Sequence, residues 1–243
     1  MTVMIQRSSI DIFEDSVLVN PWPVYRQLQE QGALVWFDRL NAAAVTRYAE
    51  CRNILRLPHI FISGKGVGLN DAVNAQSEGS VLGSDEPLHG KLKSVLLERF
   101  SPPALAQFKT QIQDQADALV DTLLGVGPFD AVKQLTQAFP LSVVCDMIGI
   151  PQEDRGRLLP WASALFDGFG PPNERWRAAQ GPTQEVFTYA FSPDLPSRLL
   201  PGSAGAHIFA AVGQGRLTYQ QGATLMVAYL AALSIRRFPH YNT

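Results

Sequence analysis

A histidine and a lysine four residues apart are the side chains of this sequence best suited to hold an anion. His89 and Lys93 lie in the stretch DEPLHGKLKSVLLERFSP, residues 85–102. This spacing places both side chains on one face of a helix, beside an apolar stripe of three leucines. Such a face suits an amphipathic anion whose carboxylates accept charge-assisted hydrogen bonds. The alternative interpretation is a solvated His/Lys pair on a surface helix.

Other motifs that could carry chemistry are weak. The stretch GKGVGLN, residues 64–70, has three glycines but lacks the Lys-Ser/Thr pair of a phosphate-binding loop, which favours a plain loop. Neither G-x-S-x-G nor H-E-x-x-H occurs, and carboxylate pairs such as Asp114 and Asp117 fall at ordinary solvated helix positions. No motif therefore supports a hydrolase or transferase activity.

The elements that must position His89 and Lys93 are mostly helical. Asp85 can cap a helix that Pro87 begins, and Asn20-Pro21 has the same form before VYRQLQEQ, which ends at Gly32. Residues 34–37 and 42–48 are strand candidates, and residues 58–84 read as a long Gly- and Ser-rich loop, a kind of segment that is often functional or mobile. Helices are predicted at 49–57, 87–99, 103–124, 134–149, 154–169, 173–190, 203–212 and 218–233. The predicted fold class is mainly α with a small β-sheet near the N-terminus.

Composition excludes several partners and compartments. Charged residues make up 17% of the 243, below the usual ~25%, which predicts a large buried core. The net charge of −2 favours neither nucleic acid nor an anionic membrane as a partner. The N-terminus has acids where a signal peptide would need an apolar run. No apolar stretch reaches the roughly 18 residues of a membrane span, and two cysteines form no disulfide framework. We therefore expect a cytoplasmic protein.

The stretch around His89 resembles the C-helix motif of bacterial cytochromes P-450, D-x-P-x-H-x-x-x-R followed by F-[ST]-P. Asp85, Pro87 and His89 match the first part, and Phe100-Ser101-Pro102 matches the second. The position of the family's arginine is occupied by Lys93, which keeps the charge but loses the bidentate fork. The resemblance implies that His89 and Lys93 bind the two haem propionates.

The resemblance continues over residues 10 to 232. LSVVCDMIGIP looks like the family's E helix, with Cys145 at a core position. GKGVGLND (64–71) and GFGPPNE (168–174) are similar to a subgroup that oxidises para-substituted benzoic acids. In that subgroup the loop after the B helix helps to bind the substrate carboxylate, which makes Lys65 the substrate-binding candidate. The alternative is that Lys65 is merely solvated.

The C-terminal residues depart from the family. The helix containing LTYQQGATLMVAYLAA resembles the I helix, which should continue A-G-x-[DE]-T-T, whereas this chain reads Leu233-Ser234-Ile235-Arg236-Arg237. We therefore expect a single incomplete cytochrome P-450-like domain over 10–233, truncated within the I helix, and an out-of-frame tail over 234–243. The segment that supplies the cysteine ligand of haem iron is absent from these residues.

The resemblance implies a parent that uses haem, O2, and electrons from a ferredoxin and its reductase to monooxygenate a small-molecule substrate, such as an aromatic acid. Cys51 and Cys145 lie in apolar helical surroundings, where burial raises a thiol pKa, so neither is expected to replace the iron ligand. We expect this fragment to be inactive and to bind haem weakly. We also expect its I helix, which includes Leu225, Met226 and Leu230, to lack packing partners. The alternative is a non-catalytic helical binding or interaction protein of the same fold.

An out-of-frame tail implies a frameshift in the gene at or just before Leu233. Such a frameshift predicts specific codons for the tail. One permitted set for Ser234 to Thr243, read two bases further on, encodes Asp-Thr-Thr-Ile-Ser-Ala-Leu-Gln-His, which continues the family's I helix. Sequencing the gene across residues 228 to 243 should find this set. Any other codon choice for Ser234, Ile235 or the two arginines would rule the frameshift out.

Overall fold

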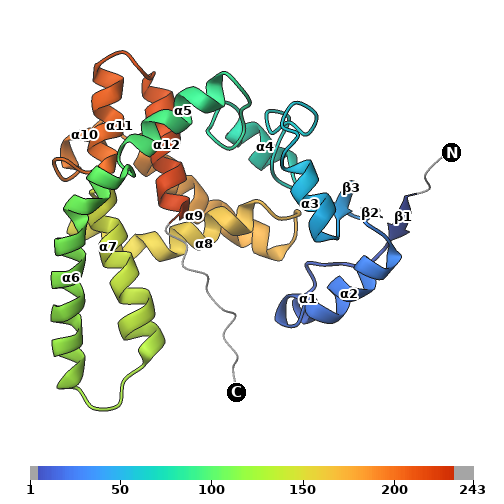
Figure 1. Cartoon of the computed structure of the whole chain (residues 1–243), viewed down its shortest axis with the longest axis horizontal. Helices are drawn as coiled ribbons and strands as arrows, with labels where there is room; N and C mark the ends of the chain where they lie inside the picture. Colours follow the sequence, from blue (N-terminus) through green and yellow to red (C-terminus); the bar gives the residue numbers. More distant parts are fainter. Residues whose placement is uncertain (1–4, 233–243) are drawn as a thin grey trace.

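The computed structural model describes residues 5–232. Leu233 and the predicted out-of-frame tail, 234–243, lie outside this range. Within it, the predicted class is confirmed, because helices dominate and one small sheet lies near the N-terminus (Figure 1). Across residues 5–232, no helix combines the length and the apolar character that a bilayer span requires.

The sheet has three short strands in the order β1-β2-β3. They are β1 (Gln6–Ser8), β2 (Leu34–Phe37) and β3 (Ala42–Val45). β2 and β3 are the two predicted strands and pair antiparallel, although β3 ends three residues before the predicted limit of 48. β1 pairs in parallel with β2 and was not predicted. Val35 and Phe37 of β2 pack with Leu28 in a small core of their own.

Helices make up most of the described chain. They are α1 (Asp15–Val19), α2 (Trp22–Gln31), α3 (Tyr48–Ile54), α4 (Asp71–Ser77), α5 (Leu88–Glu98), α6 (Pro102–Leu124), α7 (Ala138–Ile148), α8 (Leu158–Gly168), α9 (Glu174–Ala190), α10 (Leu195–Arg198), α11 (Ala204–Gly213) and α12 (Tyr219–Ala232). A π-helical turn (Val132–Gln137) precedes α7, and a 3₁₀ turn (Gln152–Arg157) precedes α8.

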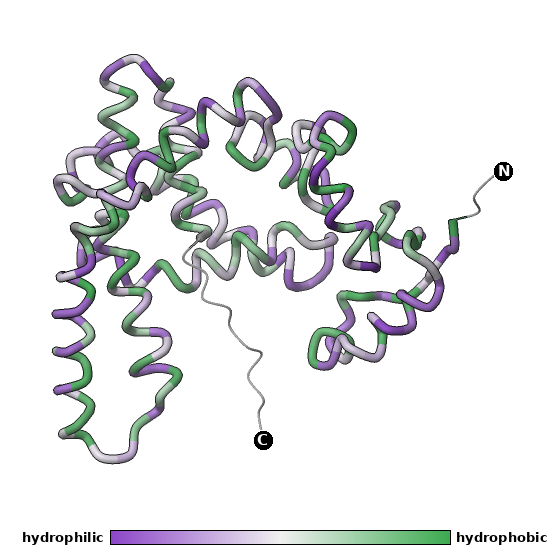
Figure 2. The backbone as a smooth tube through the Cα atoms, in the orientation of Figure 1, coloured by the Kyte–Doolittle hydropathy of each residue, from purple (hydrophilic) through white to green (hydrophobic). Residues whose placement is uncertain are grey.

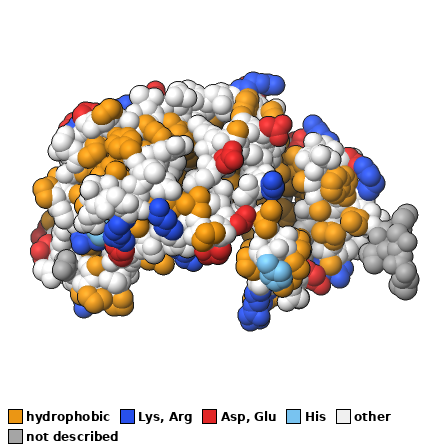
Figure 3. Space-filling model, turned by 90° about the horizontal axis from the view of Figure 1, so that it is seen from above, with side chains coloured by type: hydrophobic (Ala, Val, Ile, Leu, Met, Phe, Trp, Pro, Cys, Tyr) orange, Lys and Arg blue, Asp and Glu red, His pale blue; other side chains and the backbone are white. Residues whose placement is uncertain are grey.

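The main core surrounds α12. This helix packs against α5, α8, α9 and α11, and α8 packs along α9 (Figure 1). The hydropathy of the chain follows this arrangement, since α6, which lies at one side of the molecule, alternates between polar and apolar residues along its whole length (Figure 2). Seen from above, apolar side chains form patches on both parts of the molecule, and charged side chains are scattered among them (Figure 3).

The expectation that α12 lacks packing partners is wrong. Leu225, Met226 and Leu230 are fully buried, and Tyr229 is nearly so. The Tyr229 hydroxyl donates a hydrogen bond to the Leu96 carbonyl at 3.2 Å, and burial raises the pKa of this phenol to about 12. The helices that precede α12 in the sequence are therefore sufficient to bury most of its surface.

Two expected helix caps and the long loop also need correction. α2 and α5 begin after Pro21 and Pro87, and neither Asn20 nor Asp85 caps them. The predicted loop 58–84 contains α4, whose N-cap, Asn70, accepts a hydrogen bond from the Val73 amide at 2.9 Å. Glycine and serine on both sides of this short helix concealed it in the sequence.

An ionic cluster holds the C-terminal end of α5. Glu98 contacts His207 of α11 at 2.7 Å and also forms an ion pair with Arg216. The Arg216 guanidinium lowers the pKa of the Glu98 carboxyl. Because these partners come from the α11 region, the cluster attaches α5 to the main core.

The burial of α12 predicts a large effect for Leu230→Ala. Leu230 is 0% exposed, so removal of its side chain should lower the free energy of unfolding by about 2–5 kcal/mol. Leu124→Ala is the matched control, because Leu124 is 78% exposed and its loss should change stability by less than about 0.5 kcal/mol. Urea unfolding followed by circular dichroism measures both. A non-cooperative transition in the unmodified chain would contradict this packing.

Candidate functional site

The predicted anion-binding pair lies on α5. His89 is half-buried, and its Nδ1 lies 2.8 Å from the Val81 carbonyl oxygen. Because a carbonyl can only accept a hydrogen bond, Nδ1 carries the proton and the ring orientation is held. Lys93 is exposed, and it has no hydrogen-bond or ion-pair partner among residues 5–232. The two residues therefore share a helix at the predicted spacing. The Lys93 ammonium can donate to an anion, and Nε2 of His89 can do so when the ring carries a second proton.

Asp85 connects α5 to the loop that carries Lys65. Its carboxylate accepts hydrogen bonds from the backbone amides of Ser63 at 2.8 Å and Gly64 at 2.9 Å. Lys65 itself is exposed. The carboxylate that was expected to cap a helix instead fixes the backbone beside the predicted substrate-binding lysine.

The two stretches similar to the benzoate-oxidising subgroup lie side by side. The Leu69 amide donates to the Phe169 carbonyl at 2.9 Å. The buried Asn70 side-chain amide donates to the carbonyls of Gly168 and Gly170, both at 2.8 Å. Residues 64–70 are thus joined to the turn between α8 and α9, about a hundred positions further along the chain.

The glycines of this loop allow a close fit to α4. Asn74 Oδ1 accepts from the amides of Val67 at 2.9 Å and Gly68 at 2.8 Å. Gly66 has φ of +125°, which residues with a Cβ rarely adopt. A Cβ on Gly68 would come within 2.1 Å of Val73 Cγ1. The loop is therefore a closely fitted structural segment.

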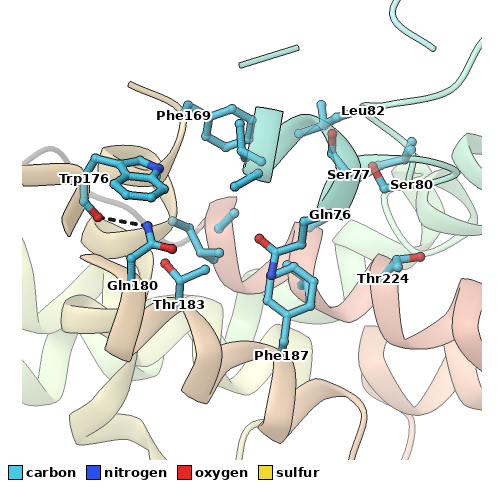
Figure 4. Close-up of a pocket in the computed structure, with 18 residues that line it drawn as sticks. Gln76, Ser77, Ser80, Leu82, Phe169, Trp176, Gln180, Thr183, Phe187 and Thr224 are labelled. Atoms are coloured by element: carbon cyan, nitrogen blue, oxygen red, sulfur yellow. Dashed lines mark hydrogen bonds between the residues drawn. The ribbon is translucent and has the colours of Figure 1, made fainter. Parts of the chain in front are cut away.

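A pocket lies between α4, the α8–α9 turn, α9 and α12 (Figure 4). Its empty volume is about 740 Å³, a value that includes space open to solvent. Aromatic rings from Phe169, Trp176 and Phe187 form part of the wall. The polar groups come from Gln76, Ser77, Ser80, Gln180, Thr183 and Thr224.

Sequence reasoning missed this pocket. Trp176, Gln180, Thr183 and Phe187 follow one another at spacings of four, three and four residues, which places them on one face of α9. This mixed polar and aromatic stripe was a detectable signal. His89, Lys93 and Lys65 do not line the pocket, so the cations singled out from the sequence and the cavity occupy different places.

The residues present fit the propionates of a haem but do not fit its iron. Lys93, and His89 when its ring is doubly protonated, offer donors suited to carboxylates. Cys145 is fully buried, and burial raises the pKa of its thiol to about 11, which disfavours the thiolate that binds iron. Cys51 is half-buried, and its Sγ lies 3.4 Å from the Val45 carbonyl oxygen. No cluster of three or more potential metal ligands occurs within residues 5–232.

Solved structures identify the class of fold. Full-length CYP116B46 from Tepidiphilus thermophilus superposes with a TM-score of 0.73 at 19% identity, over 93% of this chain and 32% of that one. No protein-family model matches the chain. The described residues therefore have the fold of the N-terminal portion of a cytochrome P-450, the predicted fold, which the structure confirms.

Curated relatives agree with this class. Cytochrome p450 CYP199A2 of Rhodopseudomonas palustris is 34% identical over 227 residues, which cover 92% of this chain and 55% of that protein. A methyl-branched lipid omega-hydroxylase of Mycobacterium tuberculosis is 33% identical over 135 residues, 54% of this chain and 31% of that protein. The chain thus spans about half or less of the length of these relatives. By sequence and by fold, it corresponds to the N-terminal portion of the bacterial cytochromes P-450, and the match to CYP199A2 fits the predicted subgroup.

The hydrogen bonds of Asn70 predict a specific loss in Asn70→Asp. An aspartate can still cap α4, but it cannot donate to the carbonyls of Gly168 and Gly170. We expect the free energy of unfolding to fall by about 1–3 kcal/mol, and protease cleavage within residues 63–70 to become faster. Asn53→Asp, at an exposed position, is the control and should change neither quantity. Equal effects of the two substitutions would show that the Asn70 bonds contribute nothing.

Proposed function

We propose that this chain forms the substrate-binding N-terminal part of a cytochrome P-450 that monooxygenates a small organic molecule. The observation that carries the proposal is the pocket between α4, α9 and α12, which joins aromatic walls to a few polar groups. The similarity to cytochromes P-450 over 92% of the chain supports the reaction class. A ferredoxin and its reductase are the electron donors that this class implies.

The chain's own residues would contribute binding and shape. Phe169, Trp176 and Phe187 would hold the apolar body of a substrate, and the Asn70 bonds would keep α4 against the α8–α9 turn. His89 and Lys93 would bind the haem propionates. The bound haem supplies the chemistry that activates oxygen, while these residues supply the binding surfaces.

We also propose that the 243 residues alone do not catalyse this reaction. The support comes from the two cysteines, since Cys145 is buried with a raised pKa and the Cys51 thiol contacts a backbone carbonyl. The same pocket supports a second candidate function, that of a binding protein without catalysis. A small molecule can bind there without any residue that coordinates iron.

A haemin titration tests the role of the α5 cations. Lys93→Ala should weaken haemin affinity about two- to fivefold, since an exposed charge contributes a modest amount, and His89→Ala should weaken it by at least as much. Lys91→Ala is the matched control, because Lys91 is exposed on the same helix two positions away and faces elsewhere. If Lys91→Ala has the same effect as Lys93→Ala, the propionate assignment is wrong.

The same samples test catalytic competence. After reduction and addition of carbon monoxide, we expect no haem-thiolate band in the difference spectrum of the 243-residue chain. Such a band, lost in Cys51→Ser or Cys145→Ser, would refute the proposed inactivity and identify the ligand.

A further inference from the structure

The pocket has no charge in its described wall. Within residues 5–232, none of the side chains that line it belongs to Lys, Arg, His, Asp or Glu (Figure 4). A carboxylate moved from water into such a place loses its hydration without gaining a counter-ion, which is costly. A neutral polar group loses much less. The wall therefore favours a neutral ligand over a negatively charged one.

Three of the polar side chains in the wall already donate a hydrogen bond within the chain. The hydroxyls of Ser77 and Thr224 each donate to a carbonyl three residues earlier, at 3.2 Å and 2.9 Å. Gln180 Nε2 donates to the Trp176 carbonyl at 2.9 Å, as the dashed line in Figure 4 shows. These groups cannot replace a counter-ion, because a carboxylate needs several donors at once to offset the loss of water.

Thr183 differs from these groups. It is 9% exposed, and its Oγ1 is buried without a hydrogen-bond partner among residues 5–232. The side chain stands in the pocket wall on the α9 stripe, between Gln180 and Phe187 (Figure 4). Buried polar atoms are rarely left unpaired, and such an atom at a binding site calls for a partner. A ligand in the pocket could supply one hydrogen bond to this hydroxyl.

We propose that the pocket selects an electrically neutral aromatic molecule whose polar group hydrogen-bonds to Thr183 Oγ1, and that it discriminates against the corresponding carboxylate. This inference rests on the proposed function, because it names the substrate class of the same pocket. The aromatic body follows from Phe169, Trp176 and Phe187, and the single polar group follows from the one unpaired hydroxyl.

A pair of ligands that differ mainly in charge tests the proposal. The purified 243-residue chain is titrated at neutral pH with 4-methylbenzamide and with 4-methylbenzoate, by calorimetry. We expect the amide to bind at least tenfold more tightly. Thr183→Val, which keeps the shape but removes the hydroxyl, should weaken amide binding about three- to tenfold.

Three further variants separate the hydroxyl from other effects. Thr183→Ser retains a hydroxyl and should retain most of the amide affinity. Thr188→Val should leave binding unchanged, because Thr188 is exposed on the same helix and its hydroxyl donates to the Gln184 carbonyl at 2.9 Å. Lys65→Met should also leave amide binding unchanged. The urea midpoint of each variant shows that it is folded.

The possible failures are distinguishable. Benzoate that binds as tightly as the amide, and whose binding is lost in Lys65→Met, overturns the neutral-ligand inference but leaves the proposed function intact with Lys65 as the substrate-binding residue. Equal amide affinity in the Thr183→Val variant overturns the role of the hydroxyl. Failure of a folded chain to bind either ligand overturns both the inference and the assignment of this pocket as the substrate site.

Discussion

One buried amide joins the two halves of the candidate site. Asn70 caps α4 with its side-chain oxygen and donates both amide hydrogens to the turn between α8 and α9. Two of its three hydrogen bonds connect segments about a hundred residues apart, and the pocket lies between those segments. Because an unpaired carbonyl in this place would be costly, the position of α4 and the size of the cavity depend on this side chain.

The core beneath the pocket gives that connection a rigid base. α12 is surrounded by α5, α8, α9 and α11, and these helices bury Leu225, Met226 and Leu230. The Glu98 cluster attaches α5 to the same core, and so fixes the helix that carries His89 and Lys93. The pocket and the propionate-binding candidates are therefore two sites on one packed body.

Much of this arrangement could be predicted from the sequence. Long periodic segments such as 103–124 became helices close to their predicted limits, and the four-residue spacing correctly placed His89 and Lys93 on one helix. α4 and β1 were missed, because a seven-residue helix flanked by Gly and Ser, and a three-residue strand, show too few repeats for any periodicity. The pocket was missed for another reason. Thr183 is conspicuous only once tertiary packing leaves its hydroxyl without a partner.

The fit of Gly68 against Val73 has a consequence for how this protein could diversify. Where the backbone of a loop packs so closely on a neighbouring side chain that no Cβ fits between them, single substitutions cannot adjust the loop gradually. Variation in what the cavity accepts must then come from the helix faces, where one side chain can be exchanged without moving the chain. Descendants or engineered versions with altered ligand preference should therefore carry their changes on α9 and α12 and keep the glycines of the loop.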